Sequence, residues 1–310
     1  MKILIAEDDA GSRLVLGATL RKLGHAVTAV ADGRSALAAW QQGDFVLLIS
    51  DWMMPDMDGL ELCRMVRAAP RLQYTYIILL TSLSGKGSYL EGMGAGADDL
   101  ITKPFDEEHL AARVHVAQRI LALHETLRFQ AMHDHLTGLW NRGMIMATLQ
   151  EELARAARDG SCIGVIVADL DHFKRINDTY GHLAGDTVLQ ETSRRMQHAL
   201  RTYDRIGRYG GEEFLIIASG GERSDVLSVA ERIRDCVAET PVQTAAGAID
   251  VTVSLGLAIT CMGGRDDAVT VISAADAALY RAKKERNCVH VADQESAGLL
   301  EMAPTVRSLA

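Results

Sequence analysis

The chain has 310 residues, of which 48% are apolar and 24% are charged, and its net charge at pH 7 is −9. That apolar fraction is enough for well-packed globular cores and argues against wholesale disorder, and the length corresponds to roughly two domains. The negative charge disfavours DNA or RNA as a partner, because such a chain repels a phosphate backbone.

The cysteines are odd in number and scattered along the chain. They are Cys63, Cys162, Cys236, Cys261 and Cys288. They form no Cys-x-x-Cys pair, so the sequence predicts neither a disulfide framework nor a zinc site, and we expect a protein of the reducing cytoplasm. The first apolar segment is too short for a signal peptide, and no apolar run reaches the ~20 residues of a membrane span.

Residues 1–105 alternate short apolar runs with segments that have apolar residues at helical spacing. The apolar runs are Lys2–Ala6, Val27–Ala31, Phe45–Ser50, Tyr76–Ser82 and Leu100–Lys103. Segments such as Ser12–Leu23 and Gly59–Ala68 have the helical spacing. This alternation predicts a doubly wound α/β fold with a parallel five-stranded sheet and helices on both of its faces.

Charged and polar residues stand where these strands end. Glu7 and Asp8 follow the first strand, Asp51 follows the third, Thr81 ends the fourth and Lys103 ends the fifth. A parallel sheet brings these ends together, and crowded carboxylates are stable as anions only beside a cation, for which Mg²⁺ is the natural choice. Such a site can hold a phosphoryl group, with Asp51 as nucleophile. An isolated acid at a strand end is usually a solvated loop residue, but matching residues at several strand ends weigh against that interpretation.

These residues resemble the receiver domains of two-component systems. The matching motifs are residues 3–9, residues 50–59, Thr81-Ser82 and Lys103-Pro104-Phe105, and the resemblance covers residues 1–120. It implies that a histidine kinase or phosphotransfer protein phosphorylates Asp51, and that Thr81 and Lys103 form the switch. It also implies that Mg²⁺ is bound by Glu7, Asp8, Asp51 and the backbone carbonyl of Met53. Leu100 departs from the family, which often has an aromatic switch residue at this position.

Residues 106–132 predict one long helix without Gly or Pro. Val116, Ile120, Leu123 and Leu127 recur at alternating steps of four and three residues. One interpretation is that this is the last helix of the first domain and packs on its own sheet. The other is that its second half links the two domains and pairs with a second copy of the chain as a short coiled coil.

The pattern changes from residue 133 onward and predicts an α+β domain over residues 133–292. We expect strands at Cys162–Asp169 and Ile249–Ile259, and helices at Gly185–Leu200, Val226–Ala238 and Ala268–Arg286. Segments Asp204–Tyr209 and Glu212–Ala218 flank Gly210-Gly211, which is a tight-hairpin signal. The tail, residues 293–310, is polar without periodicity, and we expect it to be mobile.

Two segments of this domain supply what nucleotidyl transfer needs. Asp169 and Glu212 can hold Mg²⁺, and a nucleotide can lie against Gly210 and Gly211 because they have no Cβ. Backbone N–H groups after Asp171, with Lys174, can bind phosphate oxygens. The side chains of Asn177 and Asp186 can read a base edge, and a carboxylate suits the two donors of guanine. Taken singly, a Gly-Gly turn is usually a plain hairpin, and an Asp-x-Asp pair is usually solvated.

Together these segments resemble the GGDEF family of diguanylate cyclases, in its Glu variant. The matching motifs are residues 134–142, 177–182, 185–186, 210–214, 253–256 and 275–283. The resemblance implies a metal site of Asp169, the Leu170 carbonyl and Glu212, with Glu213 nearby. It further implies a catalytic contribution of Lys174 and Lys283. The nucleotide-binding residues it implies are Phe173, Asn177, Asp186, Gly210 and Gly211.

The two resemblances together imply a phosphorylation-regulated enzyme that condenses two GTP into cyclic di-GMP, releases two pyrophosphates and acts as a dimer. Two other interpretations stay open. The second domain could bind a guanine nucleotide without turnover, or the chain could be a scaffold whose receiver recruits a partner. The family usually has Gly-Arg-Asn after its last helix. Here Lys283-Lys284-Glu285-Arg286-Asn287 lacks that Gly and is one residue shorter, which leaves open whether Arg286 reaches phosphate.

A possible product site precedes the Gly-Gly hairpin. Arg201-Thr202-Tyr203-Asp204 resembles the inhibitory site of GGDEF proteins, where cyclic di-GMP binds away from the catalytic centre. A guanidinium can pair with guanine or phosphate, a carboxylate can accept from guanine, and Arg232 could supply a second cation. The plain alternative is a local surface ion pair between Arg201 and Asp204.

Overall fold

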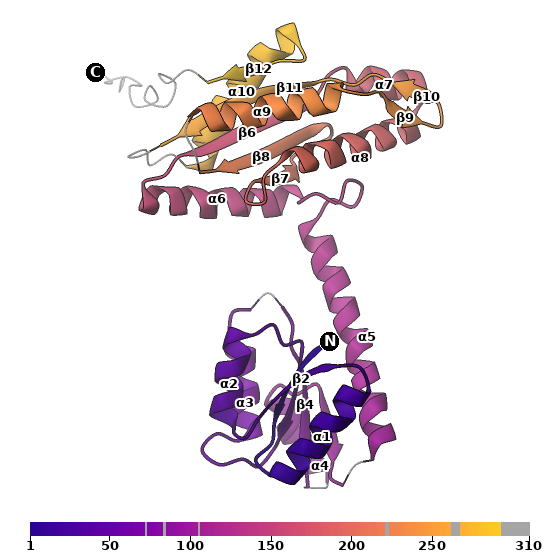
Figure 1. Cartoon of the computed structure of the whole chain (residues 1–310), viewed down its shortest axis with the longest axis vertical. Coiled ribbons are helices and arrows are strands. Elements are labelled where there is room, and N and C mark those ends of the chain that lie inside the picture. Colours follow the sequence, from indigo (N-terminus) through magenta and orange to yellow (C-terminus); the bar gives the residue numbers. More distant parts are fainter. Residues whose placement is uncertain (72, 83–84, 105, 221–222, 262–266, 293–310) are drawn as a thin grey trace, which may run out of the picture. The chain divides into compact units, whose positions relative to one another are not determined.

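The computed structural model describes residues 1–310 apart from 72, 83–84, 105, 221–222, 262–266 and 293–310, so the tail that we expected to be mobile lies outside the described residues. The chain divides into two compact units, Met1–Arg128 and Phe129–Ala310 (Figure 1). No described helix has both the length and the apolar character that crossing a membrane requires.

The first unit is built on a parallel sheet, as the sequence predicts. Its strands are β1 (Lys2–Ala6), β2 (Ala26–Val30), β3 (Leu47–Asp51), β4 (Tyr76–Thr81) and β5 (Asp99–Thr102). Their order is β2-β1-β3-β4-β5, and every neighbouring pair is parallel. The central strands β1, β3 and β4 are buried on both faces, which is why they read as continuous apolar runs.

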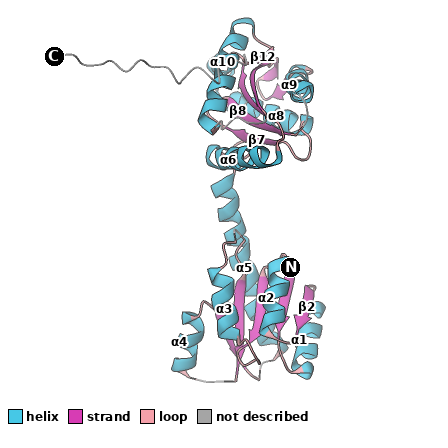
Figure 2. Cartoon of the chain, turned by 90° about the vertical axis from the view of Figure 1, so that its left-hand side faces the viewer, coloured by secondary structure: helices cyan, strands magenta, loops and turns pink. Residues whose placement is uncertain are grey.

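Helices cover both faces of this sheet (Figure 2). They are α1 (Ala10–Lys22), α2 (Gly33–Gln42), α3 (Gly59–Ala68), α4 (Lys86–Gly94) and α5 (Glu107–Met132). Asp9, Asp32 and Asp58 start the first three, because each side chain accepts a hydrogen bond from a backbone N–H three residues later. The helices α1 and α5 pack on one face of the sheet, while α2 and α3 pack on the other.

The long helix α5 changes character along its length. Leu110, Val114 and Ala117 are buried against the sheet of the first unit. Further along, Leu123 and Leu127 are 64% and 62% exposed. The first half therefore packs as the last helix of its own domain, and the second half presents apolar side chains to solvent. Pairing of that half with a second copy stays a prediction.

The second unit has a mixed sheet of the predicted α+β type. Its elements are α6 (Arg142–Asp159), β6 (Ile163–Leu170), α7 (Phe173–Tyr180), α8 (His182–Ala199), β7 (Arg205–Arg208), β8 (Glu213–Ser219), α9 (Arg223–Ala238), β9 (Val242–Thr244), β10 (Gly247–Ile249), β11 (Val253–Thr260), α10 (Ala268–Glu285) and β12 (Val289–Val291). The main sheet has the order β12-β11-β6-β8-β7. Strand β6 is antiparallel to both of its neighbours, and β12 is parallel to β11. The helices α7, α8 and α9 bury one face of the sheet, and α6 and α10 bury the other.

The structure corrects the expected strand at Ile249–Ile259. It is two strands, because β10 ends at Ile249 in a separate hairpin with β9, and β11 begins only at Val253. Just before β11 the N–H of Asp171 donates to the carbonyl of Thr252, which continues the pairing of β11 with β6 and not that of β10 with β9. The regular recurrence of apolar residues from 249 to 259 therefore did not reveal that the chain pairs with β9 before residue 250 and with β6 from Val253 onward.

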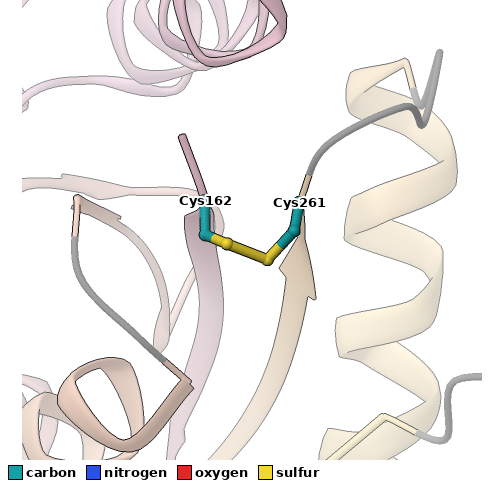
Figure 3. Close-up of a disulfide and its surroundings, with 2 residues drawn as sticks. All are labelled: Cys162 and Cys261. Carbon is teal, nitrogen blue, oxygen red and sulfur yellow. A yellow bond between two sulfur atoms is a disulfide. The ribbon is translucent and has the colours of Figure 1, made fainter. Parts of the chain in front are cut away.

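The structure also corrects the prediction that the chain has no disulfide, because Cys162 and Cys261 are bonded although 99 positions separate them (Figure 3). Strands β6 and β11 are antiparallel, with Ile163 opposite Thr260, so the residues just outside that pair face each other. Cysteine spacing alone could not reveal this pair, because only the strand register brings the two residues together. Among the described cysteines, Cys63, Cys236 and Cys288 are free.

Candidate active sites

The first site lies at the carboxyl ends of β1, β3 and β5. Lys103 Nζ lies 2.8 Å from Glu7 Oε2 and 2.9 Å from Asp51 Oδ2, so one ammonium bridges two carboxylates. Carboxylate oxygens of Glu7, Asp8 and Asp51 lie within 4.8 Å of one another. The structure thus brings together four residues that the sequence places at the ends of three separate strands.

Electrostatics at this site favour an added cation. Burial, together with the charges of Asp51 and Asp8, raises the pKa of Glu7, although Lys103 opposes the shift. Although burial opposes it, hydrogen bonds to Glu7 and Asp51 raise the pKa of Lys103. Glu7 Oε1 is buried without a hydrogen-bond partner among the described residues. An unpartnered buried carboxylate oxygen beside two more acids fits a hard divalent ion such as Mg²⁺.

The other predicted receiver residues flank this cluster. Thr81 is buried at the end of β4, and Met53 lies in the loop two residues after Asp51. Leu100, on β5, is partly buried and packs against the core on the α3 side of the sheet. The peptide bond between Lys103 and Pro104 is cis.

The second site lies at the end of β6 and the start of β8. In the antiparallel ladder Asp169 pairs with Glu213, and the N–H of Leu170 donates to the carbonyl of Glu212 at 3.3 Å. Burial raises the pKa of Asp169, Lys283 opposes the shift, and the charges of Glu212 and Glu213 add to it. The carboxylates of Asp169, Glu212 and Glu213 and the carbonyl oxygen of Leu170 are ligands of the kind that suits Mg²⁺, and we call this set of residues the cradle.

Lys283 of α10 supplies the cation of this cradle. Its Nζ contacts the Asp169 carboxylate, and it lies 3.3 Å from the carbonyl oxygen of Leu170 and 3.6 Å from Asp171 Oδ1. The sequence assigns Asp169 and Leu170 to metal and Lys283 to phosphate. The structure places the Lys283 ammonium against the Asp169 carboxylate and the Leu170 carbonyl, which are the expected metal ligands. Because these oxygens already surround one positive charge, their chemistry fits a bound Mg²⁺.

The signature hairpin, residues 208–214, is held by hydrogen bonds from both sides. Arg208 donates to the Gly211 carbonyl at 3.0 Å and to Asp134 Oδ1 at 3.1 Å. A Cβ on Gly210 would lie 2.6 Å from Glu213 Oε2, whereas one on Gly211 would meet nothing within 4 Å. A Cβ at Gly210 would therefore displace the end of the Glu213 side chain, and Gly211 leaves open space.

The predicted base-reading residues lie together where α7 packs on α8. Asn177 Oδ1 lies directly against the backbone of Gly185, which leaves no room for a Cβ there, and the Phe173 ring lies beside them. Asp186 follows Gly185 and is half-buried, as is Asn177. Lys174, one residue after Phe173, is exposed.

Two site residues escaped the sequence interpretation. Asp171 is 4% exposed, and its carboxylate accepts from Thr252 Oγ1, Ser254 Oγ and the N–H of Asn287. Asp134 anchors Arg208, as described above. The Asp-x-Asp spacing of Asp169 and Asp171 could have indicated that Asp171 belongs to the site. Its hydrogen-bond partners, at and just before the start of β11 and after α10, are known only from the fold.

The residues of the expected product site are arranged differently from a simple ion pair. Asp204 is buried and accepts the backbone N–H of Arg201 at 2.9 Å, while the Arg201 guanidinium donates to Tyr203 Oη at 2.9 Å. Arg201 and Asp204 line a surface cavity of about 430 Å³. Arg232 donates from Nε to the carbonyl of Ala199. Arg286 contacts His172 at the start of α7.

The fold and sites define a two-unit protein with one group of carboxylates and a lysine at the strand ends of each unit. Residues 131–288 match the sequence profile described as diguanylate cyclase, GGDEF domain, and residues 3–115 match that of the response regulator receiver domain. The chain therefore belongs to the GGDEF diguanylate cyclase family, and its first unit is a response regulator receiver domain.

Relatives support the same assignment. Response regulator PleD of Caulobacter vibrioides is 32% identical over 257 residues, which are 80% of this chain and 56% of PleD, so the chain spans about half the length of that relative. The coiled coil and GGDEF domain of DgcB from Caulobacter crescentus, solved with c-di-GMP, is 33% identical, with a TM-score of 0.55, over 60% of this chain and 98% of that one. SiaD from Pseudomonas aeruginosa, solved with its activator SiaC, is 37% identical, with a TM-score of 0.51, over 60% of this chain and 71% of that one.

Proposed function

We propose that this protein condenses two GTP into cyclic di-GMP and releases two pyrophosphates, acts as a homodimer, and is controlled by phosphorylation of Asp51. The observation that carries the proposal is the cradle of Asp169, the Leu170 carbonyl, Glu212 and Glu213 beside the glycine hairpin. The GGDEF unit of each chain in the dimer holds one GTP, and the 3′-OH of each GTP attacks the α-phosphorus of the GTP held by the GGDEF unit of the other chain.

Different residues of the GGDEF unit bind the base, the phosphates and the metal. Asn177 and Asp186 bind guanine, Gly210 and Gly211 let the nucleotide approach the backbone, and Lys174 binds phosphate oxygens. When bound by Asp169, Leu170 and Glu212, Mg²⁺ neutralises phosphate charge and lowers the pKa of the attacking hydroxyl. Without Mg²⁺, Lys283 neutralises the charge of the Asp169 carboxylate. With Mg²⁺ bound there, Lys283 would be able to turn toward the phosphates. Glu212 also helps to remove the proton of the 3′-OH.

Control begins in the receiver unit. Asp51 accepts a phosphoryl group from a histidine kinase or phosphotransfer protein, Lys103 neutralises its oxygens, and Thr81 responds to it. Glu7, Asp8, Asp51 and the Met53 carbonyl would hold a Mg²⁺, which would supply further positive charge at the phosphoryl oxygens. The exposed Leu123 and Leu127 of α5 offer the surface through which two chains pair. That DgcB was solved with its coiled coil supports this part of the proposal.

Product feedback and location complete the proposal. Cyclic di-GMP binds at Arg201 and Asp204, with Arg232 as a second cation, and slows the enzyme. We place the protein in the cytoplasm, where GTP and histidine kinase partners are available. In that compartment the bond between Cys162 and Cys261 is expected to be a reversible one, since persistent disulfides are rare there.

The deciding experiment incubates the purified protein with GTP and Mg²⁺, with and without beryllofluoride, and measures pyrophosphate and cyclic di-GMP. We expect one cyclic di-GMP for every two pyrophosphates and a faster rate with beryllofluoride. GTP binding without pyrophosphate would identify a nucleotide sensor and overturn the catalytic proposal. Turnover without any response to beryllofluoride would overturn the regulatory part alone.

A further inference from the structure

Three side chains of types that can bind metals meet beside the edge strand β12 of the second unit, and none of them belongs to the cradle. They are Glu285 at the end of α10, and Cys288 and His290 at and within β12. A carboxylate oxygen of Glu285, the Cys288 Sγ and a ring nitrogen of His290 all lie within 4.8 Å of one another. His290 Nε2 lies 3.4 Å from Glu285 Oε1.

The geometry of the local backbone produces this convergence. Val289 and Val291 pack into the core on the α8 and α9 side of the sheet, so Cys288 and His290, which alternate with them, face the opposite side, where α10 lies. Arg286 and Asn287 both have positive φ, 64° and 45°, and this tight reversal returns the chain to the last turn of the helix. This turn is where the sequence lacks the Gly that is usual after the last helix, so the shortened turn brings Cys288 and His290 back to Glu285.

Charge at this point favours a cation. The carbonyl of Ala282, near the negative end of α10, lies 3.4 Å from Cys288 Sγ. Burial and the charges of Glu285 and Asp171 raise the pKa of the Cys288 thiol, although Arg234 opposes the shift. Nearby basic side chains are already engaged. Arg234 pairs with Glu231 and Asp235, and Arg281 donates to the Val291 carbonyl.

We propose that Glu285, Cys288 and His290 bind a thiophilic divalent transition-metal ion, with Zn²⁺ as the best match and water as the fourth ligand. Thiolate, imidazole and carboxylate are the three ligand types of tetrahedral Zn²⁺ sites, and a thiolate discriminates against Mg²⁺. The thiol proton leaves to solvent when the metal binds. The site ties β12 to the end of α10, next to the Asn287 N–H that donates to Asp171.

The test uses Co²⁺ as a spectroscopic probe of the full chain. The protein is reduced, freed of metal and kept in excess Mg²⁺, so that the two carboxylate sites do not take up cobalt. We expect a thiolate-to-cobalt charge-transfer band and tetrahedral d–d bands that saturate at one cobalt per chain and disappear when Zn²⁺ is added. Absence of the charge-transfer band would overturn the proposal. This readout needs no GTP turnover, so its result is independent of the proposed enzyme activity.

Variants assign the site to its residues. Cys288→Ser should lose the charge-transfer band and bind metal more than about 100-fold more weakly, since even loss of an outer-shell partner costs about 10–100-fold. His290→Gln keeps the thiol and should weaken binding at least about 10-fold while changing the d–d bands. The matched controls Cys236→Ser and Cys261→Ser should retain wild-type spectra. A band that survives Cys288→Ser, or that disappears in either control, would place the metal elsewhere.

Discussion

Each of the two units places one lysine among carboxylates at the end of a strand, but the receiver unit does so with a parallel sheet and the GGDEF unit with antiparallel strands. In the receiver unit, Lys103 from β5 bridges Glu7 after β1 and Asp51 on β3, because parallel strands end at one edge. In the GGDEF unit, Lys283 from a helix pairs with Asp169 at the end of one strand, whose antiparallel neighbour β8 begins there with Glu213. Parallel topology makes a site from residues far apart in sequence but similarly placed on each strand. Antiparallel topology makes one from a strand end and a hairpin, so register decides which residues meet.

The largest expected effect comes from removing the cross-link between the ends of β6 and β11 in the GGDEF unit while leaving the receiver unit unchanged. In oxidised protein, replacing both Cys162 and Cys261 by Ser should lower the free energy of unfolding of the GGDEF unit by about 3–5 kcal/mol, since the bond closes a loop of about 100 residues. Calorimetry should show one transition moved to lower temperature and the other unchanged. Cys236→Ser is the matched control, and identical transitions in the double variant would show that the bond contributes no stability.

The next effect concerns the chemistry of the cradle. Glu212→Gln keeps the size of the side chain and removes a metal-binding charge, so cyclic di-GMP synthesis should fall more than about 100-fold. Circular dichroism should be unchanged. A rate within tenfold of the wild type would refute the assignment of Glu212.

The corresponding change in the receiver unit should affect control and not chemistry. Asp51→Asn cannot be phosphorylated, so stimulation by a phosphodonor should disappear. Coupling of this kind is typically worth about 1–3 kcal/mol, or about 5–150-fold in rate. Initial rates with and without acetyl phosphate measure it, and undiminished stimulation would identify another acceptor.

These two sites also show what the sequence could and could not predict. Buried parallel strands have continuous apolar runs, so Glu7, Asp51 and Lys103 could be placed at one edge from sequence alone. Helix α6 was not predicted, and the bond between Cys162 and Cys261 depends on the register of β6 and β11, which apolar periodicity does not specify. The convergence of Glu285, Cys288 and His290 was equally hidden, because it depends on two left-handed residues in a turn.

The position of Lys283 shows the same limit. Its motif indicates a residue near phosphate, but only the packing of α10 against β6 places its ammonium at Asp169 and the Leu170 carbonyl. A lysine in that position competes with a divalent ion for the same oxygens. Sequence therefore identified Asp169, Leu170 and Lys283 as members of the second site, and the fold supplied their pairing.

The smallest expected effect separates catalysis from feedback within the GGDEF unit. Arg201 donates to Tyr203 and lies 3.9 Å from Asp225, and neither partner is buried, so its guanidinium can turn toward a ligand. A charged hydrogen bond to guanine or phosphate contributes about 1.5 kcal/mol, which corresponds to about tenfold in product affinity. Arg201→Ala should therefore leave the initial rate unchanged and shift product inhibition to about tenfold higher cyclic di-GMP. Progress curves with added product measure both quantities, and Arg194→Ala on α8, which pairs with Glu191 and does not line the surface cavity beside Arg201, is a control of equal charge change. If the curves of Arg201→Ala and the wild type slow at the same product concentration, cyclic di-GMP does not act through this arginine.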